Sequence, residues 1–143
     1  MDHRFGYARW DGQKWNVRLI AYAGTRLYPG EDDYTGLGSL DPQDPSTIII
    51  STDADPVTGK PLISKASFRR FHELFRGVTS DGGETWHWTP LTSNSSTDNL
   101  RSLVPKWNDP RRVVVWMRGA YRVNRGEWTT RVVSAVLDAK DWK

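Results

Sequence analysis

Apolar residues along the chain come in short runs, and most of these runs alternate with polar residues in the period of two that marks a β-strand. The clearest are WNVRLIAY at 15–22, RRVVVWM at 111–117 and TTRVVSAVL at 129–137. TIII at 47–50 and HELFRGV at 72–78 lie between them. No segment keeps the 3.6-residue period over the length of a long amphipathic helix. The pattern therefore predicts an all-β protein.

Turn-forming residues separate these runs. They occur as Asp11-Gly12, Pro29-Gly30, Asp41-Pro42, Asp44-Pro45, Asp55-Pro56, Asp81-Gly82-Gly83 and Asn108-Asp109-Pro110. Short strands with frequent turns favour a sandwich, a barrel or a propeller. A weak internal repeat narrows the choice, since WDGQKW at 10–15 and SDGGETW at 80–86 both place Asp-Gly shortly before Trp in an expected hairpin.

The expected strands divide into groups of two, four and three. FGYARW and WNVRLIAY come first; TGLGSL, TIII, HELFRGV and WHWTPL follow; NLRSLVP, RRVVVWM and TTRVVSAVL come last. A four-stranded unit recurring at roughly 40 to 50 residues is the spacing of propeller blades. We expect one partial β-propeller domain over 1–143, with about two and a quarter four-stranded antiparallel blades: a half blade at 5–22, a full blade at 34–91 and a partial blade at 99–138.

Such a fragment would leave sheet edges unpaired. We expect a missing N-terminal part of the propeller, or other copies of the chain in a closed homo-oligomer, to complete it.

The stretch TSDGGETW carries the most specific pattern in the chain. Its residues Thr79-x-Asp81-x-Gly83-x-Thr85-Trp86 resemble the Asp-box of BNR-repeat β-propellers, S/T-x-D-x-G-x-T-W. Further sequence segments, including HELFRGVTSDGGETWHWTPLT and VVVWMRGAYR, resemble the BNR-4 repeat branch of that family, and this resemblance covers nearly all of residues 5–137. The chain is similar only to a C-terminal portion of full members, which are several times longer.

The resemblance implies a propeller related to sialidases and to propeller-type polysaccharide lyases, which are often secreted or periplasmic. It also implies that the Asp-box hairpin joins the two outer strands of a blade, at the face away from the binding site. Physical reasoning gives Asp81 a structural role, because its carboxylate can accept hydrogen bonds from its own turn. Gly83 would supply a positive φ, and Trp86 would pack between sheets.

The charge of the chain limits the classes of partner that it is expected to bind. The net charge is +3 at pH 7, and Lys and Arg are scattered along the sequence. This distribution argues against a nucleic-acid partner and leaves an acidic ligand open. There is no cysteine, no long apolar run that would cross a membrane and no apolar signal-peptide region in MDHRFGYARW. The cellular location stays undetermined.

If the Asp-box hairpin faces one end, alternation of the strands places four loops at the other: 23–35, 51–71, 91–100 and 118–127. Ligand sites normally lie on such polar loops. Arg101 and Arg118 are candidates there for binding a carboxylate, with Asn99 as a further substrate contact. The alternative for each Arg is a bridge between adjacent blades.

His72 is the candidate catalytic base. A neutral imidazole could take a proton from a sugar carbon beside a uronate carboxylate, while Tyr34 or Tyr121 returns the proton. A satisfied or solvated histidine is the alternative. The acidic triplet Glu31-Asp32-Asp33 before Tyr34 suggests the carboxylate and tyrosine pairing of sialidases, with Glu31 as a substrate contact, although a solvated loop explains it equally.

We expect no cofactor. Asp53-x-Asp55 with Thr58-Gly59 would offer oxygen ligands to Ca²⁺, but it lacks the other carboxylates of a calcium loop, so a plain turn is favoured. No phosphate-binding loop, dinucleotide fingerprint or zinc spacing is present.

The sequence thus leads to a carbohydrate-active propeller that acts on or binds an acidic oligo- or polysaccharide, as a polysaccharide lyase or a sialidase-like hydrolase. A non-catalytic propeller that binds glycan or protein is the first alternative. A structural fragment of a larger enzyme is the second.

Overall fold

The computed structural model describes residues 3–28, 30, 34–121 and 129–142. Strands dominate these residues, with a single short helix at the end. The elements are β1 (Arg4–Trp10), β2 (Trp15–Tyr22), β3 (Gly38–Asp41), β4 (Asp44–Thr52), β5 (Glu73–Val78), β6 (His87–Pro90), β7 (Asn99–Leu103), β8 (Arg112–Arg118), β9 (Arg131–Leu137) and α1 (Ala139–Trp142). Each strand overlaps a run that the alternation predicted, and the all-β class is confirmed.

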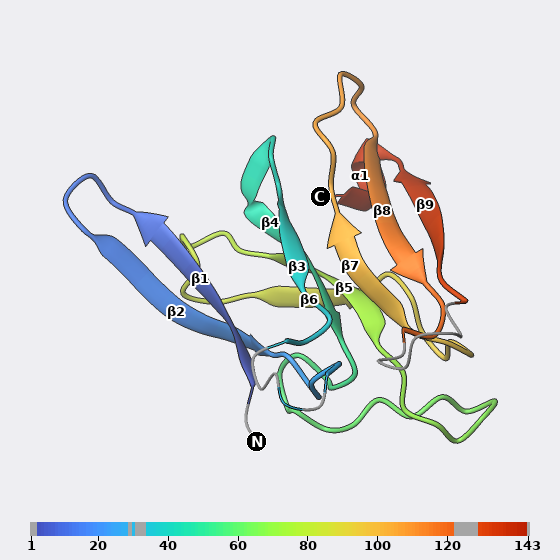
Figure 1. Cartoon of the computed structure of the whole chain (residues 1–143). Coiled ribbons are helices and arrows are strands. Elements are labelled where there is room, and N and C mark those ends of the chain that lie inside the picture. Colours follow the sequence, from blue (N-terminus) through green and yellow to red (C-terminus); the bar gives the residue numbers. More distant parts are fainter. Residues whose placement is uncertain (1–2, 29, 31–33, 122–128, 143) are drawn as a thin grey trace.

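The strands form three antiparallel sheets: the N-terminal hairpin β1-β2, the middle sheet β3-β4-β5-β6 and the C-terminal sheet β7-β8-β9. The hairpin lies on one side of the middle sheet and the C-terminal sheet on the other (Figure 1). Within the described residues, no sheet closes on itself.

The middle sheet is covered on both faces, which explains why β4 carries an unbroken apolar run. Ile48 and Ile50 lie in a cluster with Ala21 of the hairpin and Phe75 of β5. Ile49 points to the opposite face and packs in a cluster with residues of the C-terminal sheet. Successive side chains of a strand point to opposite faces, so a strand buried on both sides needs apolar residues at every position.

The helix α1 was not anticipated from the sequence. Its Trp142 is buried in the cluster that joins the middle and C-terminal sheets, with Ile49, Leu74 and Val114. The same helix supplies a backbone carbonyl at Asp141 that accepts a hydrogen bond from the Arg76 guanidinium. Burial lowers the pKa of Arg76 from its usual value. Among the described residues, no helix is long and apolar enough to cross a membrane.

The outer faces of the first and last sheets are apolar and exposed. On the hairpin, Trp15, Val17 and Leu19 alternate along β2 and therefore share one face, and these residues are 64%, 62% and 71% exposed. On β9, Val132 and Val136 are 74% and 58% exposed. The two outermost faces of the three stacked sheets are therefore hydrophobic surfaces that no other described residues cover.

Candidate functional site

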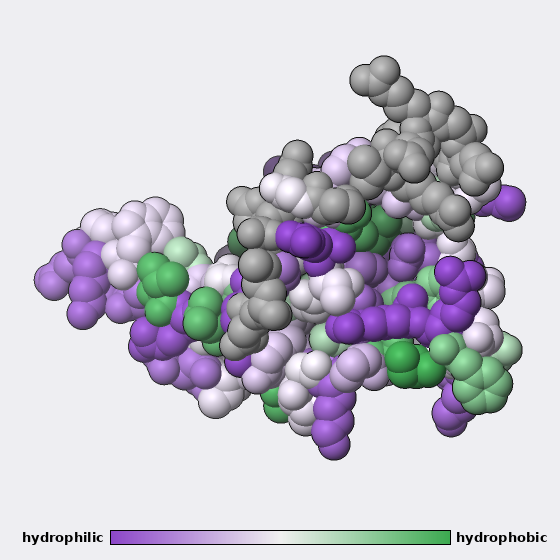
Figure 2. All heavy atoms as spheres, turned by 60° about the horizontal axis from the view of Figure 1, so that its bottom comes forward, coloured by the Kyte–Doolittle hydropathy of each residue, from purple (hydrophilic) through white to green (hydrophobic). Residues whose placement is uncertain are grey.

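Long loops gather at one end of the molecule, the lower end in Figure 1, and we call it the loop end. Backbone hydrogen bonds hold these loops together: Ala23 N donates to His3 O (2.9 Å), Arg101 N to Gly36 O (2.9 Å) and Gly119 N to Asp98 O (3.0 Å). Figure 2 looks onto this end and shows strongly hydrophilic side chains between smaller hydrophobic patches. The loops expected to share one end do so in the described residues.

Arg101 is placed at the loop end by a β-bulge. The register of β7 on β8 shifts between Leu100 and Leu103, and Arg101 adopts a φ of 53°, in the left-handed region that non-glycine residues rarely occupy. Its amide leaves the β7-β8 ladder and bonds Gly36 O of the neighbouring chain segment. Bulges redirect side chains, and backbone strain of this kind concentrates at functional sites.

Aromatic rings surround the Arg101 guanidinium. Its central carbon lies 5.4 Å from the ring centroid of Tyr34 and 5.1 Å from that of Tyr121. One of its N–H groups donates to the Tyr121 hydroxyl at 3.3 Å. Tyr28 contacts both of the other rings edge-on, each at 5.7 Å between centroids. Arg101 is exposed and forms no ion pair with a carboxylate of the described residues, so its charge is available to an acidic ligand.

Arg118 does not belong to the aromatic cluster around Arg101 and instead lines a separate pocket. It is the register partner of Arg131 across β8 and β9, and both side chains line a cavity of about 480 Å³ together with Thr97 and Thr129. Like charges directly opposite one another are unfavourable unless a counter-ion or solvent separates them. Among the described residues neither arginine forms an ion pair, so this pocket has the chemistry of an anion site.

Asn99 is fully buried and serves a polar network. Its amide nitrogen donates to His72 O at 3.1 Å and to Ser95 Oγ at 3.0 Å, while its oxygen accepts from Trp116 Nε1 at 3.0 Å. Buried Glu73 accepts from the Ser95 amide at 2.7 Å in the same network. The Asn99 side chain therefore joins the middle and C-terminal sheets and presents no polar group to solvent.

His72 is oriented by Asp98. One carboxylate oxygen of Asp98 accepts from the His72 amide at 2.9 Å and lies 3.3 Å from its Nδ1. A proton on Nδ1 would be donated to Asp98 and would leave the lone pair on Nε2, as a base requires. Nε2, however, is buried without a hydrogen-bond partner in the described residues. A substrate therefore cannot touch it in this conformation.

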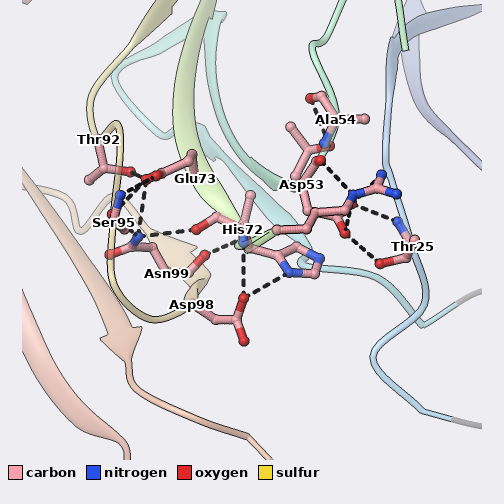
Figure 3. A network of polar contacts seen from close by, with 12 residues as sticks. Thr25, Asp53, Ala54, His72, Glu73, Thr92, Ser95, Asp98 and Asn99 are labelled. Atoms are coloured by element: carbon pink, nitrogen blue, oxygen red, sulfur yellow. Dashed lines mark hydrogen bonds and ion pairs between the residues drawn. The ribbon is translucent and has the colours of Figure 1, made fainter. Parts of the chain in front are cut away.

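A second network beside His72 contains Asp53, one of the two aspartates considered for calcium (Figure 3). Asp53 is buried, accepts from Thr25 N at 2.8 Å and pairs with Arg70 at 2.8 Å. Asp55 instead accepts from Thr58 N at 2.7 Å and closes a local turn. The two carboxylates thus have separate partners, and no cluster of three metal-ligating side chains occurs among the described residues.

The Asp-box residues form a closed turn at the opposite end. Asp81 accepts from Thr79 Oγ1 (2.8 Å), Thr85 N (2.9 Å) and Thr85 Oγ1 (2.6 Å). The hydroxyl and then the amide of Thr85, followed by the Thr79 hydroxyl, hold the pKa of Asp81 well below its usual range. Gly83 has a φ of 101°, and its carbonyl accepts from Trp86 Nε1 at 3.2 Å. A Cβ at Gly83 would lie 2.7 Å from the ring of Tyr7, so the hairpin also needs glycine there.

Of the candidate site residues, the structure brings Arg101, Tyr34 and Tyr121 into contact and places Arg118, Asn99 and His72 near them in the fold but in other environments. Glu31, with Asp32 and Asp33, lies outside the described residues. Sequence reasoning missed Tyr28, Asp98 and Arg131.

Arg131 carried a usable signal, since it begins the strand that pairs with the end of β8. No family model matches the chain, and no curated protein or solved structure matches it. Function must therefore be argued from the residues themselves.

Proposed function

We propose that this chain is part of a BNR-type β-propeller whose loop end binds an acidic glycan through Arg101. The fold part of the proposal draws support from three antiparallel sheets stacked face to face, with the hydrogen-bonded Asp-box turn at the end opposite the loops. In a propeller, these sheets are successive blades. The exposed outer faces of the first and last sheets are then the surfaces that a missing part or another copy covers.

One observation carries the functional part: a bulge with unfavourable backbone geometry holds the Arg101 cation between two tyrosine rings, without a carboxylate partner among the described residues. An arginine that bridged two blades would pair with an acid of the neighbouring sheet. Arg112 does so, since its Nε donates to buried Asp41 at 2.9 Å. Arg101 contrasts with Arg112, and guanidinium binds carboxylate in a bidentate geometry. Uronate residues supply that carboxylate, and tyrosine rings supply apolar faces for the sugar.

A second candidate function, lyase cleavage of the same glycan, draws on the Tyr121 hydroxyl. It lies 3.3 Å from the group that would neutralise the uronate carboxylate, where a proton donor to the leaving oxygen would be needed. The base would be His72, and loop movement would have to uncover its Nε2.

Calorimetric titration with a galacturonate oligosaccharide tests binding. The substitution Arg101→Gln should weaken binding by about tenfold to a hundredfold, since a charge-assisted hydrogen bond contributes about 1.5–3 kcal/mol. Lys106→Gln is the matched control, because Lys106 is an exposed cation in the β7-β8 connection at the far end. Equal affinity of Arg101→Gln and the parent chain would refute the assignment.

Absorbance of the unsaturated product during incubation with polyuronates separates cleavage from binding. Turnover that disappears in both Tyr121→Phe and His72→Gln would support the lyase. Binding without turnover would leave a glycan-binding propeller, and the absence of both would favour the structural fragment.

A further inference from the structure

The pocket between Arg118 and Arg131 lies on the inner face of the C-terminal sheet, where β8 ends and β9 begins at the loop end (Figure 1). Arg131, Val133 and Leu137 alternate along β9 and therefore share one face. Leu137 packs against the core cluster between the middle and C-terminal sheets, so this face is turned toward the middle sheet. The other β9 positions on it, Val133, Ala135 and Leu137, are apolar. Two opposing arginines thus end a face that is otherwise hydrophobic along β9.

The two cations face each other without a counter-charge. Side chains of register partners on adjacent strands have their Cβ atoms about 4.5–5.5 Å apart, so Arg118 and Arg131 repel one another when nothing lies between them. No carboxylate of the described residues lines the pocket. Asp98, which follows Thr97, directs its carboxylate at the amide and Nδ1 of His72 instead (Figure 3). Arg118 is half-buried and Arg131 exposed, so an anion from solvent can reach both guanidinium groups.

Hydroxyl groups complete the polar lining of the pocket, which Ser96, Thr97 and Thr129 supply. Thr129 Oγ1 accepts from Ala120 N at 3.1 Å, which orients the side chain and leaves its own O–H proton free to donate. Gly119 lets the ends of β8 and β9 approach, since its φ is 141° and a Cβ there would lie 2.3 Å from Thr129 O. The Thr129 hydroxyl is therefore held beside the two guanidinium groups.

This arrangement of donors favours a tetrahedral oxyanion over a carboxylate. A carboxylate has two oxygens in one plane, and a single guanidinium binds both of them. A phosphate or sulfate ion has further oxygens that point in other directions, where a second guanidinium and a hydroxyl can bind them, and its two negative charges match the two arginines. No aromatic ring of the described residues lines the pocket, in contrast to the tyrosines around Arg101, so the pocket offers no stacking face for a sugar.

We propose that the pocket between Arg118 and Arg131 binds a tetrahedral dianion, which is the chemistry shared by inorganic phosphate, sulfate and a phosphate monoester. The two guanidinium groups bind oxygens on opposite sides of the anion, and the Thr129 hydroxyl donates to another. This site is separate from the acidic-glycan site and does not depend on it, because neither Arg101 nor its tyrosines line the pocket.

NMR titration of the full chain at pH 8 tests the proposal through the amide signals of Gly119 and Thr129, with sodium chloride holding the ionic strength constant. Sulfate and phosphate should bind. Methanesulfonate, with one charge, and acetate, with a planar carboxylate, should each bind about tenfold more weakly or worse, since each loses a charge-assisted contact. Methyl phosphate distinguishes the sources: tighter binding than inorganic phosphate identifies a phosphorylated ligand, and weaker binding identifies the free ion.

Arg118→Gln and Arg131→Gln should each weaken sulfate binding by about tenfold to a hundredfold, because each removes a charge-assisted hydrogen-bonding group. Lys106→Gln makes the same change of net charge at the far end and should leave binding unchanged. Without sulfate or phosphate, Arg131→Gln should melt no lower than the parent chain, since it relieves the repulsion with Arg118. Loss of binding in this variant then reflects the site and not unfolding.

Absence of binding by both sulfate and phosphate overturns the proposal. Equal sulfate affinity of the parent chain and Arg131→Gln also overturns it, as does acetate that binds as tightly as sulfate. Arg101→Gln should retain sulfate binding, and Arg131→Gln should retain binding of the galacturonate oligosaccharide. These two results separate a failure at this pocket from a failure at the acidic-glycan site.

Discussion

The indole N–H of Trp142 donates to the carboxylate of Asp41 at 3.0 Å, joining the last described residue to the turn between β3 and β4. Asp41 is 1% exposed, and Arg112 neutralises its charge. Trp142→Ala should therefore remove both a large core side chain and a partner of a buried carboxylate. We expect a loss of about 3–5 kcal/mol in the free energy of unfolding, measured by urea denaturation.

Two further substitutions separate the contribution of packing from that of the hydrogen bond and provide an exposed control. Trp142→Phe keeps most of the packing but loses the hydrogen bond to Asp41 and part of the buried ring system, so its cost should be about 1–3 kcal/mol. Trp15→Ala, at a side chain 64% exposed, should change stability by about 0.5 kcal/mol or less. Equal stability of the Trp142→Ala and Trp15→Ala variants would contradict a packing role for α1.

Arg101 offers a test of backbone strain that is independent of ligand. At most strand positions glycine is less stable than alanine by about 0.5–1 kcal/mol. At a φ of 53° the order should reverse, with Arg101→Gly more stable than Arg101→Ala by about 1 kcal/mol. Both variants lose the tyrosine contacts, so the comparison isolates the backbone.

Arg131, an arginine at the start of β9 with an ordinary backbone conformation, is the matched position. There Arg131→Gly should be the less stable variant in thermal denaturation. If the glycine variant is less stable than the alanine variant at Arg101 as well as at Arg131, the bulge carries no backbone strain.

Asp81 should make the stability of the chain depend on pH. The pKa of its carboxyl is lower in the folded state than in the unfolded state. Its stabilising contribution is therefore complete above the unfolded value of about 3.9 and is lost as the pH falls toward the folded value. The melting temperature of Asp81→Asn should lie below that of the parent at pH 7, and the gap should narrow between pH 4 and pH 2.

Asp138→Asn serves as the control, because Asp138 is exposed and its carboxylate accepts no hydrogen bond from the described residues. The melting temperature of Asp138→Asn should stay close to that of the parent chain across the whole pH range. A gap for Asp81→Asn that widens on acidification would have the wrong sign and would exclude the carboxylate as the stabilising species.

The exposed faces of the two outer sheets should drive association between unlike surfaces, hairpin to C-terminal sheet. Light scattering should give a mass above that of a monomer, and Leu19→Lys or Val132→Lys should each abolish the association. An equimolar mixture of these two variants should form a heterodimer, because each retains one intact face. Phe68→Lys, at a loop residue 84% exposed, should leave association unchanged.

Failure of the mixture to associate would exclude the head-to-tail arrangement. A parent chain that is monomeric at high concentration would rule out the homo-oligomer and leave the remainder of the proposed propeller as the candidate to cover these faces.

Strand positions could be predicted well because burial imposes a period of two on the sequence. The run Trp15–Tyr22 was predicted with the observed bounds of β2, since Trp15, Val17 and Leu19 alternate with Asn16 and Arg18, although here the apolar face is the exposed one. The helix α1 was missed because four residues are too few to show a helical period. Its burial depends on Asp41 and Arg76, which are distant in sequence and give no local signal.

The candidate site could be predicted only in part. Alternation of strands and turns was enough to place Arg101, Tyr34 and Tyr121 at one end. The bulge that turns Arg101 outward was not visible, because no glycine or proline marks it. The burial of Asn99 and His72 also depends on how two sheets pack, and a single strand pattern carries no information about that.

The tryptophans report separately on the two interfaces of the stack. Trp86 and Trp88 lie in the cluster between the hairpin and the middle sheet, whereas Trp142 lies between the middle and C-terminal sheets. The stacked pair should give a coupled near-ultraviolet circular dichroism signal, and the buried indole of Trp142 a blue-shifted fluorescence. Optical spectroscopy can therefore follow in real time which interface loosens first as the layers come apart.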